Sequence, residues 1–422
     1  MNHYDVAVIG GGPAGLAAAL QSEKQGAKTL LIERENRLGG ILKQCIHDGF
    51  GLVRFGEKLS GPEYAYRFQA PLEGSAVEKR LLTFVSRARK IDTGFELTLA
   101  SGSGMETVRS GVLVLATGCR ERTARQIGVH GTRPAGVLTA GSAQYYTNIL
   151  GQLPARRCVI LGSGDIGLIM ARRLTLEGAT VPGVYEAKQT PSGLSRNIAQ
   201  CLDDFNIPLY TGRTVTRVFG RQRVEAVEVC SVNEFMQPIT GTEERIPCDT
   251  LILSVGLIPE NELAEKLGVP LSSETKGPIC DQNGMTMVDG IFCAGNALLV
   301  NDLVDYVSES GENAGRNAAF YAAAAKRPAR RFAAVNAGAG FLCVSPQRID
   351  MTAVDAAGDT PVTVFFRAAA ERGKTRVKAN TGGKEIFNRT YRHLRPPEME
   401  RVELKISNVQ NGEITFVMES EE

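Results

Sequence analysis

The sequence has no Cys-x-x-Cys pair, no excess of either charge and no long apolar run, and each absence excludes a class of protein. Its nine scattered cysteines predict reduced thiols in the cytoplasm, so we expect neither a disulfide framework nor an iron–sulfur cluster or other metal site. A net charge of +2 argues against a surface that coats nucleic acid. No apolar run approaches the roughly 18 residues that a membrane-spanning helix needs, and a strand beginning near Tyr4 leaves no room for a signal peptide.

Two segments of the chain repeat one pattern of apolar strand, glycine turn, helix of small residues and second apolar strand. They are residues 4–33, which end in Glu33, and residues 157–186, which end in Glu186. Continuous apolar strands of this kind are typical of parallel sheets that are covered on both faces. The sequence therefore predicts an α/β fold with two Rossmann-like dinucleotide-binding domains.

The first glycine turn, "GGGPAG", has the spacing G-x-G-x-x-G at Gly10, Gly12 and Gly15. The first glycine permits the tight turn, the second lets a pyrophosphate approach the backbone, and the third lets helix and strand pack closely. The helix that follows supplies N–H groups and partial positive charge. Glu33 stands where an acid can bind the ribose hydroxyls of an adenosine. The alternative is a tight turn of a doubly wound domain without a ligand.

The second turn, "GSGDIG", repeats this spacing at Gly162, Gly164 and Gly167. Glu186 at the end of the next strand would repel a 2′-phosphate and accept a free 2′-hydroxyl, which favours NAD over NADP. Lys188, two residues later, weakens that preference. The alternative is a duplicated domain that has lost its ligand.

A third segment, residues 286–325, predicts a short strand, a polar break at Asn296 and an alanine-rich helix. A helix start near Asp302 would direct N–H groups at the pyrimidine edge of a flavin, where negative charge develops on reduction. This segment therefore assigns the flavin to the first turn. The short β-rich runs from Phe341 onward predict a small all-β domain.

The expected domain boundaries follow from these patterns, with the second dinucleotide-binding domain inserted into the first. We expect the FAD-binding domain in two parts (1–137 and 259–326), the NAD-binding domain at 138–258, a linker at 327–340 and the small all-β C-terminal domain at 341–422.

The phrases "VIGGGPAG", "VLATG" (114–118), "ILGSGDIG", "LSVG" (253–256) and "FCAGN" (292–296) resemble the two-dinucleotide-binding flavoproteins, the pyridine nucleotide–disulfide oxidoreductase superfamily. The resemblance implies FAD in the first turn, NAD(H) in the second and completion of the FAD site by "FCAGN", where this chain has Asn296 in place of the usual Asp. The residues it marks for cofactor binding, beyond the glycines and acids above, are Pro13, Ala14, Arg34, Gly39, Gly40, Ala116, Thr117, Gly118, Asp165, Ile166, Gly256, Gly295, Asn296, Asp302 and Leu303.

Longer phrases, among them "QCIHDGFG", "ATGCRERT", "SRNIAQCLDDFNIPL" and "SVGLIPENEL", are similar to a bacterial subgroup labelled sarcosine-oxidase-alpha-like. Its members are encoded beside an FAD-dependent glycerol-3-phosphate dehydrogenase. The resemblance implies such a dehydrogenase as protein partner. Because the C-terminal domain lacks cofactor-like residues, we expect it to be the docking surface, and we expect an oligomer. Related cyanide synthase and opine oxidase subunits commonly carry a cysteine-rich tail, whereas this chain has only Cys343 after residue 293.

The loop "LGGILKQCIHDGFG" (38–51) holds one cysteine, Cys45, and no other cysteine lies within a dozen residues. A dithiol relay is therefore not expected. Cys45 could pack against the flavin, cycle through a sulfenic acid as in NADH peroxidases, or tune the flavin together with His47. Lys43 could compensate charge on the reduced flavin or be solvated. We take Cys45, His47 and Lys43 as candidate catalytic residues.

The function expected from these observations is that of an FAD-dependent NAD(H) oxidoreductase subunit. It would pass electrons between nicotinamide and flavin and on to or from a protein partner, with the glycerol-3-phosphate dehydrogenase as the expected one. The alternatives are a self-contained NADH oxidase or peroxidase that uses Cys45, and a non-catalytic assembly subunit.

Overall fold

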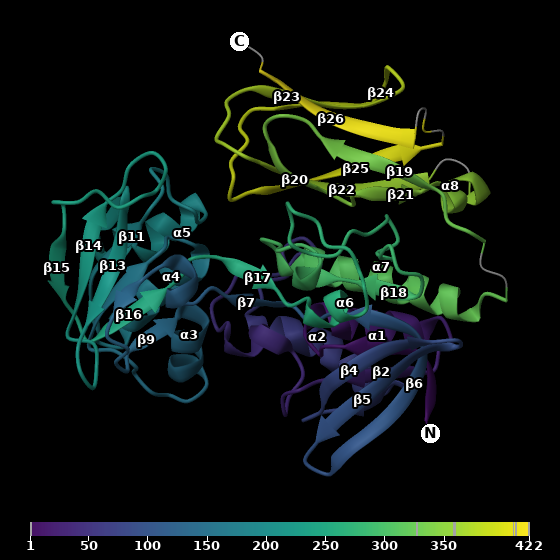
Figure 1. The fold of residues 1–422 in the computed structure, drawn as a ribbon, viewed down its shortest axis with the longest axis horizontal. Helices are drawn as coiled ribbons and strands as arrows, with labels where there is room; N and C mark the ends of the chain where they lie inside the picture. Colours follow the sequence, from purple (N-terminus) through teal and green to yellow (C-terminus); the bar gives the residue numbers. More distant parts are fainter. Residues whose placement is uncertain (1, 326–327, 358–359, 408, 410–411, 421–422) are drawn as a thin grey trace. The chain divides into compact units, whose positions relative to one another are not determined.

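The computed structural model describes the chain except residues 1, 326–327, 358–359, 408, 410–411 and 421–422 (Figure 1). The chain divides into two compact units, unit 1 (Met1–Cys119 and Pro259–Glu422) and unit 2 (Arg120–Ile258). The boundary expected at residues 326 and 327 lies outside the described residues. Residues 120–137, expected in the first part of the FAD-binding domain, fall in unit 2 because a strand formed by His130 and Gly131 pairs with a strand of that unit.

Unit 1 is built on a parallel sheet in the order β3-β2-β1-β6-β18. An antiparallel extension of β6 continues through β5 and β4. The strands are β1 (His3–Ile9), β2 (Thr29–Ile32), β3 (Glu78–Arg80), β4 (Phe84–Ile91), β5 (Gly94–Ser101), β6 (Gly104–Leu115) and β18 (Ile291–Cys293). The helices are α1 (Pro13–Lys24), α2 (Gly61–Glu73), α6 (Glu262–Lys266) and α7 (Val304–Ala323), with 3-10 turns at Gly40–Gln44 and Gly295–Ala297.

The central strand β1 is buried on both faces. Val6 and Val8 point to the layer of α1, α2 and α7, while Ala7 and Ile9 point to the layer that contains β4 and β5. This alternation follows from the two-residue period of a strand, and it explains why β1 reads as a continuous apolar run.

Helices α1 and α7 lie side by side (Figure 1), and their backbones come into contact at two glycines of α7. A Cβ atom on Gly311 would lie 2.2 Å from the carbonyl oxygen of Ala14, and one on Gly315 would lie 2.2 Å from that of Ala18. The Ser22 hydroxyl donates a hydrogen bond to the Gly315 carbonyl (2.9 Å). Glycine inside a helix lowers its stability by about 1 kcal/mol, so these glycines are explained by the close approach that they allow.

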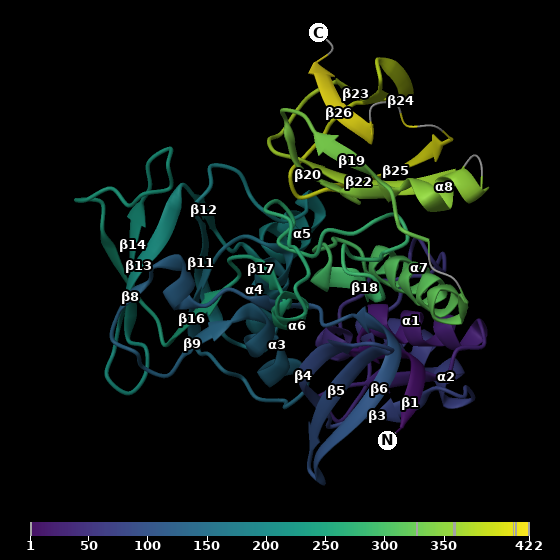
Figure 2. The same cartoon turned by 45° about the vertical axis from the view of Figure 1, so that its right-hand side comes forward.

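Unit 2 contains a parallel sheet in the order β12-β11-β10-β16-β9 and an antiparallel layer β15-β14-β13, with β8 at its edge (Figure 2). The strands are β8 (His130–Gly131), β9 (Val137–Thr139), β10 (Arg157–Leu161), β11 (Thr180–Glu186), β12 (Leu209–Thr211), β13 (Arg213–Phe219), β14 (Ala226–Ser231), β15 (Glu244–Pro247) and β16 (Thr250–Leu253). The helices are α3 (Ala140–Asn148), α4 (Asp165–Leu176) and α5 (Ser195–Cys201), with 3-10 turns at Ala124–Ile127 and Asp203–Phe205. Where the chain passes between the units, β7 (Cys119–Glu121) pairs with β17 (Leu257–Pro259).

The C-terminal module, β19 to β26, belongs to unit 1 and consists of the sheets β21-β19-β26-β23-β24 and β20-β22-β25 (Figure 2). Its elements are β19 (Phe332–Ala337), β20 (Phe341–Ser345), β21 (Arg348–Asp350), α8 (Met351–Ala357), β22 (Thr360–Ala368), β23 (Thr375–Thr381), β24 (Lys384–Tyr391), β25 (Met399–Ile406) and β26 (Glu413–Ser420). Every second residue of β22 and β23 is buried in the core between the sheets. The small β domain predicted from the sequence is thus confirmed.

Two details of the C-terminal module differ from the sequence expectation. Strand β19 begins inside residues 327–340, which were expected to be a linker, because it pairs with the distant strand β26. The short helix α8 stands within a domain that was expected to be all-β. No helix among the described residues is both long enough and apolar enough to cross a bilayer.

A buried ion pair joins the start of the C-terminal module to the rest of unit 1. Arg330 Nη1 lies 3.1 Å from Asp281 Oδ2, and the exposed fractions of the two side chains are 8% and 0%. Asp281 also accepts hydrogen bonds from the backbone N–H groups of Asn283 and Met285. Burial raises the pKa of Asp281 to about 6, although the Arg330 cation acts in the opposite direction.

Replacing Arg330 with Gln is expected to lower the free energy of unfolding by about 3 kcal/mol at pH 8, because the buried Asp281 carboxylate loses its cation. A folded pKa above the unfolded value near 3.9 favours the folded state most at low pH, and this contribution is lost as the pH rises through about 6. The loss caused by the substitution should therefore be smaller at pH 5, where Asp281 is protonated. Urea unfolding at both pH values measures the difference.

Arg331→Gln is the matched control. Arg331 pairs with Asp355 on the surface, where the exposed side-chain fractions are 69% and 52%. Its loss should change stability by less than about 1 kcal/mol at either pH. Equal losses for the two arginine variants would contradict the assignment of the buried pair.

Candidate functional site

The first glycine turn lies at the carboxyl end of β1, where its backbone is in close contact with the backbone of Ala116. Gly10 has a φ of +109°, and a Cβ on it would lie 2.2 Å from the carbonyl oxygen of Ala116. A Cβ on Gly15 would lie 1.7 Å from the carbonyl oxygen of Gly10. Neither position can carry a side chain, so the turn brings α1 close to the ends of β1 and β6.

The loop of Gly39 and Gly40 closes over this turn. The Gly39 N–H donates to the Gly11 carbonyl (2.8 Å), and a Cβ on Gly40 would lie 2.9 Å from Gly12 Cα. A Cβ on Gly12 would meet nothing closer than Gly40 Cα at 3.8 Å. The structure therefore brings Gly10, Gly12, Gly15, Gly39 and Gly40 together, and Gly12 is the one of these five at which an added Cβ would meet no atom closer than van der Waals distance.

Glu33 at the end of β2 is 7% exposed and is held by backbone donors. Its Oε2 accepts the Gly11 N–H (2.7 Å) and its Oε1 accepts the Glu35 N–H (2.8 Å). Each carboxylate oxygen retains a second lone pair, which can accept a ribose hydroxyl. Arg34 follows on the surface of the protein.

Helices α1 and α4, which follow the two glycine turns, are among the described helices whose first turns no side chain caps, together with α5, α6 and α7. Helix α2 begins with a capping box made by Ser60 and Glu63, and α3 begins with a side-chain cap from Thr139. No side chain caps α1 at Gly12 or α4 at Gly164. These uncapped N-termini are positions where phosphate oxygens can take the place of a capping side chain.

Residues of the third segment lie against the same turn. A Cβ on Gly295, whose φ is +65°, would lie 2.7 Å from the Cβ of Ala14. Asn296 Oδ1 accepts the Asn301 N–H (3.0 Å), and its amide lies 3.6 Å from Cys119 Sγ.

Residues 116–118 end at this same edge of the sheet. The hydroxyl of Thr117 donates to the Glu260 carbonyl (2.6 Å), and the Gly118 carbonyl accepts the Glu260 N–H (2.9 Å). The predicted residues Pro13, Ala14, Ala116, Thr117, Gly118, Gly295 and Asn296 thus gather at one edge of the sheet.

Asp302 takes a role that the sequence did not predict. Helix α7 begins at Val304 with Leu303 as N-cap, two residues later than expected. The Asp302 carboxylate binds Arg367 (2.6 Å) and accepts the Met399 N–H (2.7 Å), both in the C-terminal module. Two long-range bonds therefore turn this carboxylate toward the module.

The second glycine turn in unit 2 repeats the first. A Cβ on Gly162, whose φ is +96°, would lie 2.1 Å from the Ser254 carbonyl oxygen, and the Gly167 N–H donates to Ser254 Oγ (3.1 Å). A Cβ on Gly164 would lie 3.2 Å from the same Oγ. Gly256, two residues beyond Ser254, has a φ of +102°. Ser254, which directly follows β16, thus contacts all three glycines of the turn.

Asp165 and Ile166 are the first two residues of helix α4, and their side chains have different surroundings. Asp165 Oδ1 accepts the Leu194 N–H (2.8 Å) and the Asn197 side-chain N–H (2.7 Å), so it anchors the loop before α5. Ile166 packs against the core under α4.

Glu186 matches Glu33 in its surroundings and is 6% exposed. Its Oε2 accepts the Ser163 N–H (3.0 Å), the Ser163 hydroxyl (2.6 Å) and the Ser192 hydroxyl (3.1 Å), while Oε1 accepts the Lys188 N–H (3.0 Å). These four hydrogen bonds fix the position of the Glu186 side chain. The sequence analysis did not predict Ser163 and Ser192 as site residues. Ser163 lies between Gly162 and Gly164, where the first turn has Gly11, and Ser192 lies outside the turn.

The loop around Cys45 is a 3-10 turn followed by residues that pack on α2. The Gly61 N–H donates to the Cys45 carbonyl (2.8 Å), and a Cβ on Gly61 would lie 2.8 Å from the Cys45 Cβ. The thiol donates to the Ile41 carbonyl (3.4 Å). Although the residue is partly exposed, desolvation of the sulfur raises the pKa of Cys45 to about 12. All nine cysteines lie among the described residues, and none of them forms a disulfide.

Lys43 and His47 flank Cys45 but have different surroundings. The Lys43 ammonium pairs with Glu35 and donates to the Arg37 carbonyl (2.9 Å), which is a surface arrangement. This pairing favours a role in holding the loop over the catalytic role expected for Lys43. The His47 ring lies 5.0 Å from the Phe50 ring, between centroids.

Asp305 is a buried acid that the sequence did not predict. It lies in the first turn of α7 and accepts the N–H groups of Gly51 (3.3 Å) and Arg54 (2.8 Å). Arg54 also bonds to Glu312 further along α7. The loop after Cys45 is thus tied to the helix of the third segment. The sequence signal that could have indicated Asp305 is its place directly after the start of α7.

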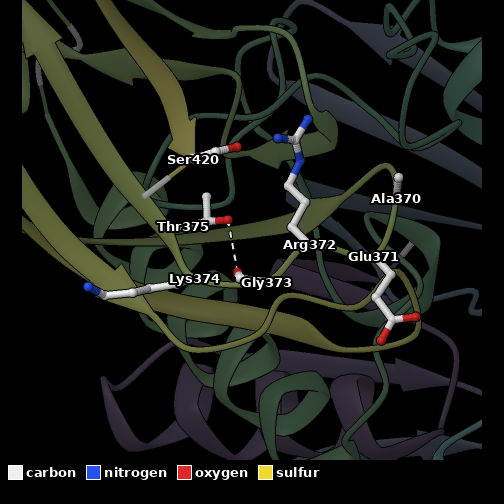
Figure 3. A pocket seen from close by; sticks show the side chains of 7 residues that line it. All are labelled: Ala370, Glu371, Arg372, Gly373, Lys374, Thr375 and Ser420. Carbon is white, nitrogen blue, oxygen red and sulfur yellow. Dashed lines mark hydrogen bonds between the residues drawn. The ribbon is translucent and has the colours of Figure 1, made fainter. Parts of the chain in front are cut away.

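Two cavities lie away from both glycine turns. One of about 440 Å³ is in the C-terminal module, where Glu371, Arg372 and Lys374 point in different directions (Figure 3). The other, of about 570 Å³, lies in unit 2 beneath residues 123–139. Neither cavity is lined by a residue predicted to bind a cofactor. Among the described residues, no group of three or more His, Cys, Asp or Glu side chains is placed to hold a metal ion.

Comparison with known proteins identifies the family. The family model of the pyridine nucleotide-disulphide oxidoreductases matches residues 4–337, and the chain belongs to this family. The fold is shared with thioredoxin reductase from T. acidophilum, which has a TM-score of 0.62 and 20% sequence identity and covers 76% of this chain and 98% of that one. Members of this family use FAD and NAD(P)H, and a flavin and a pyridine nucleotide are the cofactors of this chain.

Curated relatives are similar over part of their length. The HcnB subunit of hydrogen cyanide synthase from Pseudomonas protegens is 29% identical over 62% of this chain and 58% of that protein. An opine oxidase subunit from Agrobacterium tumefaciens is 27% identical over 76% of this chain and 65% of that protein. The chain thus spans less than two thirds of the length of these relatives.

The residues at both turns fit dinucleotides. Each turn combines an uncapped helix, backbone that no Cβ could occupy, and a buried acid whose Oε1 accepts a single N–H group. A pyrophosphate beside Gly12 or Gly164 would take the place of the missing caps, and Glu33 or Glu186 would bind ribose.

Glu33→Gln is expected to weaken FAD binding about tenfold and to lower the free energy of unfolding by about 1–3 kcal/mol. An amide leaves one acceptor oxygen for the two N–H groups of Gly11 and Glu35, and its own NH₂ group faces a donor. Flavin fluorescence titration and urea unfolding measure the two effects. Glu35→Gln, which removes an exposed partner of Lys43, should leave FAD affinity unchanged.

The thiol of Cys45 is expected to react slowly with iodoacetamide at pH 8. With a pKa of about 12, its thiolate fraction is on the order of a thousandfold smaller than that of an ordinary cysteine near 8.5. The alkylation rate, followed by peptide mass spectrometry, should keep rising up to pH 10. A rate that levels off below pH 8 would contradict the raised pKa.

Proposed function

We propose that this chain is an FAD-dependent, NAD(H)-linked oxidoreductase subunit that exchanges electrons with a protein partner and uses no redox disulfide. The observation that carries the proposal is the pair of equivalent glycine turns, each with a buried acid, in a chain whose nine described cysteines form no disulfide. Two dinucleotide cradles supply a donor and an acceptor, and Cys45 has no second cysteine within a dozen residues of the sequence.

Bound FAD supplies a ring that accepts or releases two electrons, and NAD(H) supplies or accepts the hydride. The chain's own groups hold these molecules. The first turns of α1 and α4 take the pyrophosphates, while Glu33 and Glu186 take the ribose hydroxyls. Glu186 supports NAD over NADP, because an acid at this position would repel a 2′-phosphate and accept a free 2′-hydroxyl.

The Cys45 loop supports a role in shaping the flavin site. Gly61 and the α2 N-terminus fix the loop, and burial keeps the Cys45 thiol protonated at neutral pH. A protonated thiol is a poor nucleophile toward peroxide, which weighs against the sulfenic-acid alternative. His47 stays a candidate proton donor in this loop.

The partner we propose is an FAD-dependent glycerol-3-phosphate dehydrogenase, on the basis of the sequence phrases that resemble the subgroup encoded beside it. The names of the curated relatives support a multi-subunit assembly, because HcnB and the opine oxidase relative are themselves subunits. We further propose that the C-terminal module carries the docking surface and that the assembly works in the cytoplasm, where nine reduced thiols persist.

Anaerobic titration of the yellow protein with NADH tests the proposal. NADH should bleach the flavin absorption stoichiometrically, and NADPH should require at least about tenfold more nucleotide because of Glu186. Cys45→Ser should leave NADH-to-dye activity within about twofold of wild type, since no thiol step is involved. A protein that binds FAD yet is not bleached, alone or with its partner, would favour the assembly role. Peroxide turnover abolished by Cys45→Ser would favour the peroxidase.

A further inference from the structure

Within unit 1, the C-terminal module contacts the segment that precedes α7. Arg367 of β22 binds Asp302 Oδ1 (2.6 Å), and the Met399 N–H of β25 binds Asp302 Oδ2 (2.7 Å). The same guanidinium donates to the Pro396 carbonyl (2.9 Å), which fixes it within the module. The exposed fractions of the Arg367 and Asp302 side chains are 14% and 20%, so water screens this pair less than a surface pair.

Residues 298–303 form neither helix nor strand, and side-chain contacts determine their path. At one end of this segment Asn296 Oδ1 accepts the Asn301 N–H (3.0 Å), and Gly295 packs on Ala14 of the first glycine turn. At the other end Asp302 is bound to the module. A segment with few backbone bonds moves when such anchors are removed.

Ring packing continues the contact into α7. The rings of Tyr306 and Phe365 have centroids 5.2 Å apart at an angle of 57°. Tyr306 lies in the first turn of α7, and Phe365 lies on β22 two residues before Arg367. The module therefore contacts both the N-terminus of α7, through Phe365, and the segment before it, through Arg367.

We propose that Arg367 is a positioning residue for FAD, which acts through Asp302 on residues 295–303 and makes the C-terminal module part of the flavin site. The inference rests on the proposed function, because it assumes that FAD occupies the first glycine turn. It assigns the module a task besides docking. A protein bound to the module would then change the affinity for flavin, and flavin would change the affinity for that protein by the same factor.

Arg367→Gln, compared with Arg401→Gln, tests the inference. Arg401 joins the module to Glu309 in α7 (2.7 Å), so its loss loosens the same interface without touching residues 295–303. Arg367→Gln should raise the Kd for FAD about tenfold, while Arg401→Gln should raise it less than about twofold. Flavin fluorescence titration gives the Kd, the visible spectrum of bound FAD reports its surroundings, and urea unfolding gives the stability of each variant. Arg367→Lys, which keeps the cation, should restore most of the affinity and the wild-type spectrum.

The outcomes separate this inference from the proposed function. Wild-type protein that retains no FAD would overturn both. Wild-type protein that binds FAD, with the two Gln variants weakened equally or not at all, would overturn the role of Arg367 alone. A loss of affinity in Arg367→Gln that exceeds that in Arg401→Gln at equal stability, with rescue by Lys, supports it.

Discussion

Backbone segments that are distant in sequence meet at the carboxyl end of β1 at distances that leave no space for a Cβ atom. Gly10 lies against Ala116, Gly15 against Gly10, and Gly311 against Ala14. Because these glycines let α1 approach both β1 and α7, its N-terminus lies at the edge of the sheet. The carboxyl ends of parallel strands are where dinucleotides bind in such folds, so one steric constraint builds the fold and prepares the site.

A hydrogen bond from the backbone to a buried glutamate also holds each glycine turn, and it is the same in both units. A buried glutamate at the end of the second strand accepts the N–H of the residue between the first two glycines, Gly11 in unit 1 and Ser163 in unit 2. The bond fixes the turn and also holds the acid where a ribose hydroxyl can reach it. The same hydrogen bond thus holds both glycine turns.

Sulfur contributes to packing throughout the chain. Burial raises the pKa of Cys158 to about 12 and those of Cys248 and Cys343 to about 11, and it has the same effect on Cys45. Thiols in this state are weak nucleophiles. The chain thus has the fold of its family, while these buried cysteines pack as small apolar residues.

The sequence by itself determined the two Rossmann-like sheets, the glycine turns and the terminal acids Glu33 and Glu186, because these depend on local periodicity and on spacing within about 30 residues. Periodicity also predicted a β-rich C-terminal domain. Only the tertiary structure decided the roles of Asp302, Asp305 and Arg367 and the strand β19 in the expected linker. Each of these depends on a partner far away in the chain, Met399 or β26 for example, and no local pattern encodes such a contact.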